Sequence, residues 1–166
     1  MVLAVISDTH GIFTLVRKKL RELKGIDYLI HLGDNASDAA QLSQEFGIPL
    51  EYVKGNCDFP TKDELEKVIE IEGKKILLTH GHRYYVKYEY QTILDRGKEL
   101  GVNAVFFGHT HIPMISKQED ILLLNPGSPS LPREGAKRTI ALVTIDKSGI
   151  FPRLVNLEEA SVIKEA

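Results

Sequence analysis

Near its N-terminus the chain reads Val2-Leu3-Ala4-Val5-Ile6-Ser7-Asp8-Thr9-His10. This is an apolar run of strand length that ends in a carboxylate and an imidazole. The same pattern recurs four more times, where apolar runs stop just before Asp34, Asn56, His80, and the pair His109 and His111. Ligands bind in the crevice outside the carboxyl ends of the strands of an open sheet. The recurrence therefore predicts a sheet-based protein with one functional edge.

The bulk properties fit one soluble domain spanning residues 1–166. Hydrophobic residues make up 43% of the chain and charged residues 27%, which is ordinary for a globular protein. The net charge of −2 lacks the basic excess that attracts a nucleic-acid polymer. No apolar stretch is long enough to cross a membrane, no cationic leader precedes the first strand, and the single cysteine suits a reducing compartment. We expect a cytoplasmic protein with no membrane partner.

The periodicity of apolar residues predicts the order of the elements. Three amphipathic segments have helical spacing: residues 12–23, 37–46 and 87–100. Ser37 is the expected N-cap of the second helix. Strand-like runs fill most of the remainder: residues 28–32, 48–53, 68–72, 75–79, 104–107, 114–116, 121–124, 139–145 and 151–157. This order predicts an α/β protein, a four-layer α-β-β-α sandwich of two mixed sheets flanked by helices.

Two pairs of polar residues have the spacing of metal ligands. Asp8 and His10 are two residues apart, as are His109 and His111. At an extended strand end, residues i and i+2 point to the same side, so each pair can reach one ion. Imidazole nitrogens suit zinc, manganese, iron and nickel, whereas carboxylate and amide oxygens suit harder ions. This mixed set predicts a first-row transition metal and differs from structural zinc sites, which use cysteines.

The strand ends carry more donors than one ion needs. The seven candidate ligands are Asp8, His10, Asp34, Asn56, His80, His109 and His111. Because a carboxylate can bridge, two ions about 3.5–4 Å apart would hold a hydroxide between them and polarise a phosphoryl oxygen. Taken singly, an Asp or His at a strand end is usually a turn former or a cap, and one such motif is a weak signal. Their joint recurrence favours a paired metal site.

Five blocks of the sequence resemble the motifs of the calcineurin-like metallophosphoesterases: Asp8-x-His10, Gly33-Asp34, Gly55-Asn56, Thr79-His80-Gly81 and Gly108-His109-Thr110-His111. The short chain and the block Gly55-Asn56-Cys57-Asp58 look like the small YfcE-type phosphodiesterases in particular. The resemblance spans residues 1–132 or so. It implies an enzyme that hydrolyses small phosphodiesters through a hydroxide bridging two metal ions.

The resemblance also implies a role for each ligand. Three residues would hold the first metal ion: Asp8, His10 and His111. Three would hold the second ion: Asn56, His80 and His109. Asp34 would bridge the two ions. The implied cofactors are divalent transition-metal ions, manganese first, with nickel, iron or zinc as alternatives. The expected catalytic group comprises Asp34, Asn56, His109 and Cys57.

Cys57 departs from many relatives, which have a histidine there that is thought to protonate the leaving group. A thiol with a pKa of about 8.5 is a poor substitute for an imidazolium, so a preference for leaving groups of low basicity is expected. The alternative is that Cys57 is a small buried filler. The next residue, Asp58, either orients a neighbouring ligand or forms an Asx-turn before Pro60.

Three further features lie beside the motifs. The segment 125–135 begins with Asn125-Pro126-Gly127-Ser128, which resembles a loop of these small enzymes whose backbone amides would face a phosphate. His31 lies inside an apolar run and is expected to be a core histidine with a satisfied hydrogen bond. His82 is expected to be an exposed loop residue, with an approach to a substrate phosphate as the alternative.

Two other functions stay open. A retromer subunit of eukaryotes has this fold with a degraded metal site, so a protein-binding scaffold is one alternative, although the presence of all seven ligands favours catalysis. A nuclease is the other, and the lack of a basic excess argues against a polymer substrate. The apolar runs 121–124 and 139–145 would offer a self-complementary edge for a homo-oligomer.

Overall fold

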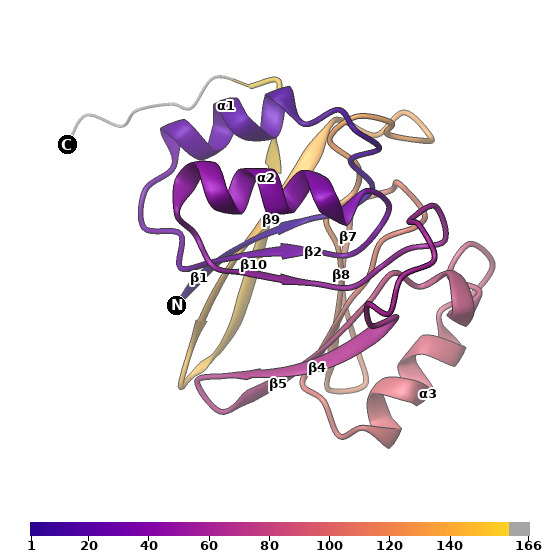
Figure 1. Ribbon diagram of the computed structural model, residues 1–166. Coiled ribbons are helices and arrows are strands. Elements are labelled where there is room, and N and C mark those ends of the chain that lie inside the picture. Colours follow the sequence, from indigo (N-terminus) through magenta and orange to yellow (C-terminus); the bar gives the residue numbers. More distant parts are fainter. Residues whose placement is uncertain (160–166) are drawn as a thin grey trace.

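The computed structural model describes residues 1–159, which form two five-stranded sheets with helices outside them (Figure 1). The first sheet has the order β10 (Gly149–Asn156), β9 (Thr139–Asp146), β1 (Val2–Ile6), β2 (Tyr28–His31) and β3 (Leu50–Tyr52). The second has the order β4 (Glu66–Ile71), β5 (Lys74–Thr79), β6 (Ala104–Phe106), β8 (Ile121–Asn125) and β7 (Met114–Gln118). The helices are α1 (Thr14–Glu22), α2 (Ala36–Phe46), the 3₁₀ helix η1 (His82–Tyr84) and α3 (Gln91–Glu99).

Both sheets are mixed, as predicted. In the first, β1, β2 and β3 are parallel, whereas β9 runs antiparallel to β1. In the second, β5, β6 and β8 are parallel, and β4 and β7 pair with them as antiparallel edge strands. The structure confirms the predicted α/β sandwich of two mixed sheets.

Alternation along β1 separates two apolar layers. Leu3 and Val5 lie in the core between the sheets, whereas Ala4 and Ile6 face α1 and α2. A third apolar layer packs α3 against the other face of the second sheet. Strands covered on both faces are apolar along their length. Polar side chains on these strands therefore appear where the strands end, and that is where the candidate ligands lie.

The start of α2 differs from the prediction. The helix begins at Ala36, not after Ser37, and its N-cap residue Asn35 has left-handed backbone (φ 71°) and makes no side-chain cap. Asp58, from a separate loop, accepts the hydrogen bonds of the first turn instead. Sequence periodicity cannot reveal such a cap because the capping residue is remote in the chain.

Two other expectations are corrected by the topology. The runs 121–124 and 139–145 were expected to form an exposed edge, but they belong to β8 and β9, and each of these strands pairs with neighbours on both sides. They cannot supply the edge for a homo-oligomer. The helix expected over 87–100 starts only at Gln91, because residues 85–89 form a turn in which Tyr88 N and Glu89 N both donate to Tyr85 O.

Candidate metal centre

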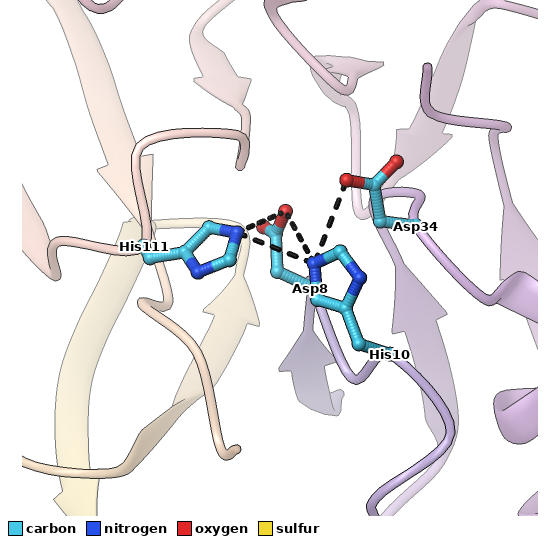
Figure 2. Close-up of side chains that lie close together, drawn as sticks. All are labelled: Asp8, His10, Asp34 and His111. Atoms are coloured by element: carbon cyan, nitrogen blue, oxygen red, sulfur yellow. Dashed lines mark hydrogen bonds and ion pairs between the residues drawn. The ribbon is translucent and has the colours of Figure 1, made fainter. Parts of the chain in front are cut away.

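Four of the predicted ligands lie together at the edge where the two sheets meet (Figure 2). One ligating atom from each of Asp8, His10, Asp34 and His111 lies within 4.8 Å of the corresponding atoms of the other three. Asp8 Oδ1 lies 3.2 Å from His111 Nε2, and His10 Nε2 lies 3.3 Å from His111 Nε2. Residues far apart in the sequence thus surround one small volume.

A second group adjoins the first through Asp34. Asp34 Oδ2 lies 3.4 Å from His80 Nε2 and 3.6 Å from His10 Nε2. His109 Nδ1 lies 3.2 Å from His80 Nε2. Asp34 therefore stands between two sets of imidazoles, a position from which a carboxylate can reach two ions.

Asn56 makes no hydrogen bond to these groups. Its side chain is exposed, and its amide nitrogen lies 3.5 Å from Cys57 Sγ. Within the described residues this is its only side-chain hydrogen bond. The backbone of this loop does reach the site, because Cys57 N donates to Asp34 Oδ1 at 2.9 Å.

Backbone carbonyls orient two of the imidazoles. His80 Nδ1 lies 2.7 Å from Leu32 O, and His111 Nδ1 lies 2.6 Å from Leu131 O. Each Nδ1 must donate its hydrogen to the carbonyl, so the Nε2 atom of the neutral ring carries a free lone pair. Metal-binding histidines in proteins are commonly held in this way.

Five of the candidate ligands adopt the left-handed backbone conformation. Their φ angles are 56° at Asp8, 49° at His10, 60° at Asp34, 69° at His109 and 59° at His111. This conformation is disfavoured for residues with a Cβ and persists where the surroundings enforce it, often at functional sites. The expected extended D-x-H geometry is therefore wrong, although both side chains do reach the same volume.

Glycines in the motifs allow the loops to touch. A Cβ atom on Gly108 would lie 2.0 Å from Ser7 Oγ and 2.6 Å from Asp8 Oδ2. A Cβ atom on Gly55 would lie 2.2 Å from Asp34 Oδ1. Such contacts are sterically forbidden, so these positions need glycine for close approach rather than for a special φ angle.

The charges of the site suit a cation. Burial opposes ionisation of Asp8, but His111 and His80 outweigh it and hold the pKa of Asp8 below its usual range. Burial also opposes ionisation of Asp34, and there His80 and the Cys57 amide outweigh it and lower the pKa. His109 has its pKa lowered to about 4 by burial and by the charges of His80 and Lys87, so its ring is neutral. The ionised carboxylates and the neutral His109 are in the protonation states that metal ions require. Against the effect of its burial, Asp34 and Asp8 raise the pKa of His80, so an ion that binds Nε2 would displace a proton from this ring.

One atom in particular fits a metal ion. Asp8 Oδ1 is buried and has no hydrogen-bond partner among the described residues, although its partner Oδ2 accepts from Ser7 Oγ and His109 N. An unpaired buried carboxylate oxygen costs free energy unless a cation compensates it. A divalent ion between Asp8 Oδ1 and the surrounding imidazoles would satisfy it.

The segment 125–135 braces the ligand loops. Ser128 Oγ donates to Asp8 O at 2.8 Å, and Ser130 Oγ donates to Thr9 O at 2.9 Å. Two backbone amides of the loop are used internally: Gly127 N donates to Asn125 Oδ1, and Ser130 N donates to Ser128 Oγ. The phosphate-facing role of the loop stays a prediction.

A buried chain of hydrogen bonds, which was not predicted from the sequence, connects the loops that carry Asp8 and Asp34. Gly33 N donates to His31 Nδ1 at 3.1 Å, which leaves the hydrogen of the neutral ring on Nε2, 3.0 Å from Thr9 Oγ1. This confirms His31 as a core histidine with satisfied hydrogen bonds. Thr9 lies between two ligands, but nothing in its spacing distinguishes it from an ordinary turn residue.

Two residues beside the ligands, Cys57 and His82, differ in exposure from what the sequence suggested. Cys57 is exposed, so the alternative that it is a buried filler is wrong. Partial desolvation of the sulfur, and then the charge of Asp34, raise the pKa of its thiol. His82 is half-buried on η1 rather than exposed, and its ring centroid lies 5.4 Å from that of His80.

With the site assembled, comparison with known proteins defines the class. The calcineurin-like phosphoesterase superfamily domain matches residues 1–148. The chain belongs to this superfamily. A probable metallophosphoesterase of Methanocaldococcus jannaschii is 36% identical over 162 residues, which cover 96% of this chain and 83% of the relative. The phosphodiesterase YfcE of Escherichia coli (strain K12) is 26% identical over 191 aligned positions, which cover 99% and 97% of the two chains.

Solved structures agree on the fold. A predicted phosphoesterase of Streptococcus pneumoniae has a TM-score of 0.79 at 29% identity, covering 95% of this chain and 90% of that one. Vps29 of Entamoeba histolytica, solved with zinc, has a TM-score of 0.78 at 20% identity, covering 95% and 100%. The second likeness shows the shared fold alone. Within residues 1–159, no helix combines the length and the apolar composition needed to cross a bilayer.

Proposed function

We propose that the protein is a phosphodiesterase that hydrolyses small phosphodiesters with a pair of divalent transition-metal ions, manganese first among them, in the cytoplasm. The observation that carries the proposal is the convergence of Asp8 and three other ligating side chains on one small volume, where Asp8 Oδ1 is buried without a hydrogen-bond partner among the described residues. Membership of the superfamily supports phosphoester chemistry. The likeness to YfcE, a phosphodiesterase, supports a diester as the substrate.

The proposed ligands form two sets that share Asp34. Asp8, His10 and His111 would hold one ion, and His80, His109 and Asn56 would hold the other. Within the described residues the first set is already close together. In the second set His80 and His109 are close, and the exposed amide of Asn56 would join them when the ion binds.

The chain's own groups supply orientation and protonation states. When bound, the two ions would supply the attacking hydroxide and polarise the phosphoryl oxygen. The carbonyls of Leu32 and Leu131 keep His80 and His111 in the tautomer that presents Nε2 to the site. The low pKa of Asp34 keeps its carboxylate ionised at neutral pH. Cys57 keeps its proton at neutral pH and would stand near the leaving oxygen as a neutral donor.

Turnover of bis(p-nitrophenyl) phosphate tests this proposal. Manganese-loaded protein should hydrolyse it, and a chelator should abolish the activity. Asp34→Asn should lower kcat/KM at least about a hundredfold, since loss of a ligand's outer partner alone costs about 10- to 100-fold. Asp63→Asn is the matched control, because among residues 1–159 this exposed carboxylate accepts hydrogen bonds only from Thr61 and Tyr52.

Two negative results would redirect the assignment. Absence of turnover with manganese, nickel, iron and zinc, in protein shown to contain the ions, would favour a protein-binding scaffold with this fold. Cleavage of single-stranded DNA faster than of the small diester would favour a nuclease.

A further inference from the structure

We propose that Asp58 is a positioning residue, which locks the loop of Asp34 to the loop of Asn56 and so fixes the ligands of the second metal ion. The inference rests on the proposed function and adds to it a residue that is not itself a metal ligand. It starts from an unusual concentration of hydrogen bonds on one side chain.

The carboxylate of Asp58 accepts four backbone hydrogen bonds. Oδ2 accepts from Asp34 N at 2.9 Å and from Gly55 N at 2.7 Å. Oδ1 accepts from Asn35 N at 2.7 Å and from Ala36 N at 3.2 Å. Hydrogen bonds to an ionised acceptor are stronger than those between neutral groups. Asp58 thus joins two loops and the first turn of α2 through one rigid group.

The two loops hold each other reciprocally. Asp58 accepts the backbone amide of Asp34, and Asp34 Oδ1 accepts the backbone amide of Cys57 at 2.9 Å. The backbones also touch, because a Cβ atom on Gly55 would lie 2.6 Å from Asp34 N. A shift of either loop must therefore move the other.

The hydrogen bonds of the Asp58 carboxylate act where the backbone is strained. Asp34 and Asn35 are consecutive non-glycine residues with left-handed backbone, at φ 60° and φ 71°. Each such residue costs about 1–2 kcal/mol relative to ordinary backbone. Asn35 makes no side-chain cap of its own for α2. The hydrogen bonds of Asp58 to the amides of both residues oppose relaxation of this strained pair.

Relaxation would displace the proposed bridging group. The other oxygen of Asp34, Oδ2, faces His80 Nε2 at 3.4 Å and His10 Nε2 at 3.6 Å. Loss of the hydrogen bonds to Asp58 would also free the loop that carries Asn56, whose side chain makes no hydrogen bond to the histidines. The second ion depends on both loops, whereas Asp8 and His111 are held by the serines of the 125–135 segment and by the Leu131 carbonyl. Loss of Asp58 should therefore weaken the second ion more than the first.

Asp58→Asn tests the carboxylate itself. The amide has the same size, but it replaces one acceptor oxygen by an NH₂ group that faces two N–H donors. Ser43→Ala is the matched control, because it removes a 2.6 Å hydrogen bond to Ile48 O at the opposite end of α2 and leaves the site untouched. Asp58→Ser, which keeps one acceptor, is a second variant in case Asp58→Asn does not fold.

Manganese titration by calorimetry and electron paramagnetic resonance gives a readout independent of turnover. Wild-type protein and Ser43→Ala should bind two ions and show the spectrum of an exchange-coupled pair. Asp58→Asn should keep the first ion, bind the second about 10- to 100-fold more weakly and show mainly uncoupled manganese. Its kcat should fall while KM for bis(p-nitrophenyl) phosphate changes little at subsaturating manganese, and excess manganese should restore part of kcat.

The outcomes separate this inference from the proposed function. A wild-type protein that binds no pair of ions refutes the proposed function. A wild-type pair together with unchanged second-ion affinity in Asp58→Asn refutes only the role of Asp58. Equal weakening of both ions, or failure of both Asp58 variants to fold while Ser43→Ala folds, would mean that Asp58 supports the domain as a whole, which also overturns the inference.

Discussion

His80 Nε2 lies 3.4 Å from Asp34 Oδ2, so an imidazole that follows a strand of one sheet faces a carboxylate that follows a strand of the other. The candidate metal centre therefore spans the interface between the two sheets. Neither sheet alone holds a full set of ligands. Binding of ions there should join the sheets as well as supply chemistry, and this has measurable consequences.

Metal binding should raise thermal stability. At an ion concentration about 100 times Kd, binding to the folded state alone adds about 2.7 kcal/mol, which raises Tm by roughly 5–10 °C for a domain of this size. Manganese added to chelator-treated protein should produce this shift in a thermal unfolding scan. His111→Gln should reduce it strongly, because the variant lacks an imidazole 3.2 Å from Asp8 Oδ1. Equal shifts in both proteins would place the stabilising ion elsewhere.

A comparison of Gly108→Ala with Gly101→Ala should separate the effect of a steric clash at the site from the effect of backbone strain. The added Cβ would overlap Ser7 Oγ and Asp8 Oδ2, so we expect a loss of about 1–3 kcal/mol in the free energy of unfolding, together with weaker manganese binding. Gly101→Ala is the control, since its φ of 63° is strained but no atom lies within 4 Å of the new Cβ. It should lose stability in urea unfolding but bind manganese normally. Normal binding by Gly108→Ala would show that the loops can separate at no cost to the site.

Cys57 should make the rate sensitive to the leaving group. Cys57 is exposed, but partial desolvation of its sulfur and the charge of Asp34 raise the pKa of the thiol, so it is a weak acid at neutral pH. Across aryl diesters of graded leaving-group pKa, kcat should fall steeply as the leaving group becomes more basic. Cys57→His should flatten this dependence, and Cys57→Ser should leave it steep. A flat profile for the wild-type enzyme contradicts the expectation.

His31 should make the metal-free protein less stable in acid. Burial, against the opposing charge of Asp8, lowers its pKa from 6.5 to about 4 in the folded state. The unfolded state then binds more protons, so its contribution to stability is present above pH 6.5 and is lost as the pH falls towards 4. The loss is on the order of 3 kcal/mol, at about 1.4 kcal/mol per pKa unit. In chelator, urea unfolding of wild type and His31→Gln should converge as the pH falls; parallel curves would contradict this assignment.

Much of the architecture could be predicted because strands buried on both faces must be apolar along their length. The run Val2–Ile6 and its counterparts therefore marked both the sheets and the places where polar ligands could follow. The interior position of β9 could not be predicted, since an apolar edge strand and an apolar central strand have similar composition. Pairing partners depend on contacts between segments far apart in the chain.

The residues of the candidate site could be predicted from the sequence more fully than their backbone geometry. Asp8, His10, Asp34 and His111 do lie together, but through left-handed backbone rather than extended strand ends. The backbone groups that orient the ligands could not be predicted from the sequence. The carbonyl of Leu32 orients a histidine, and every residue except proline offers an equivalent carbonyl and amide. Their use is decided by tertiary contacts.

The pairing of β1 with β9 has a consequence for how the protein is made. The strand that leads into Asp8 is flanked on one side by Thr139–Asp146, which are synthesised long after it. Until β9 has been made, the sheet that carries Asp8 is incomplete. A polypeptide that stops before Thr139 would therefore leave β1 without this neighbour and should hold a metal ion at Asp8 less tightly.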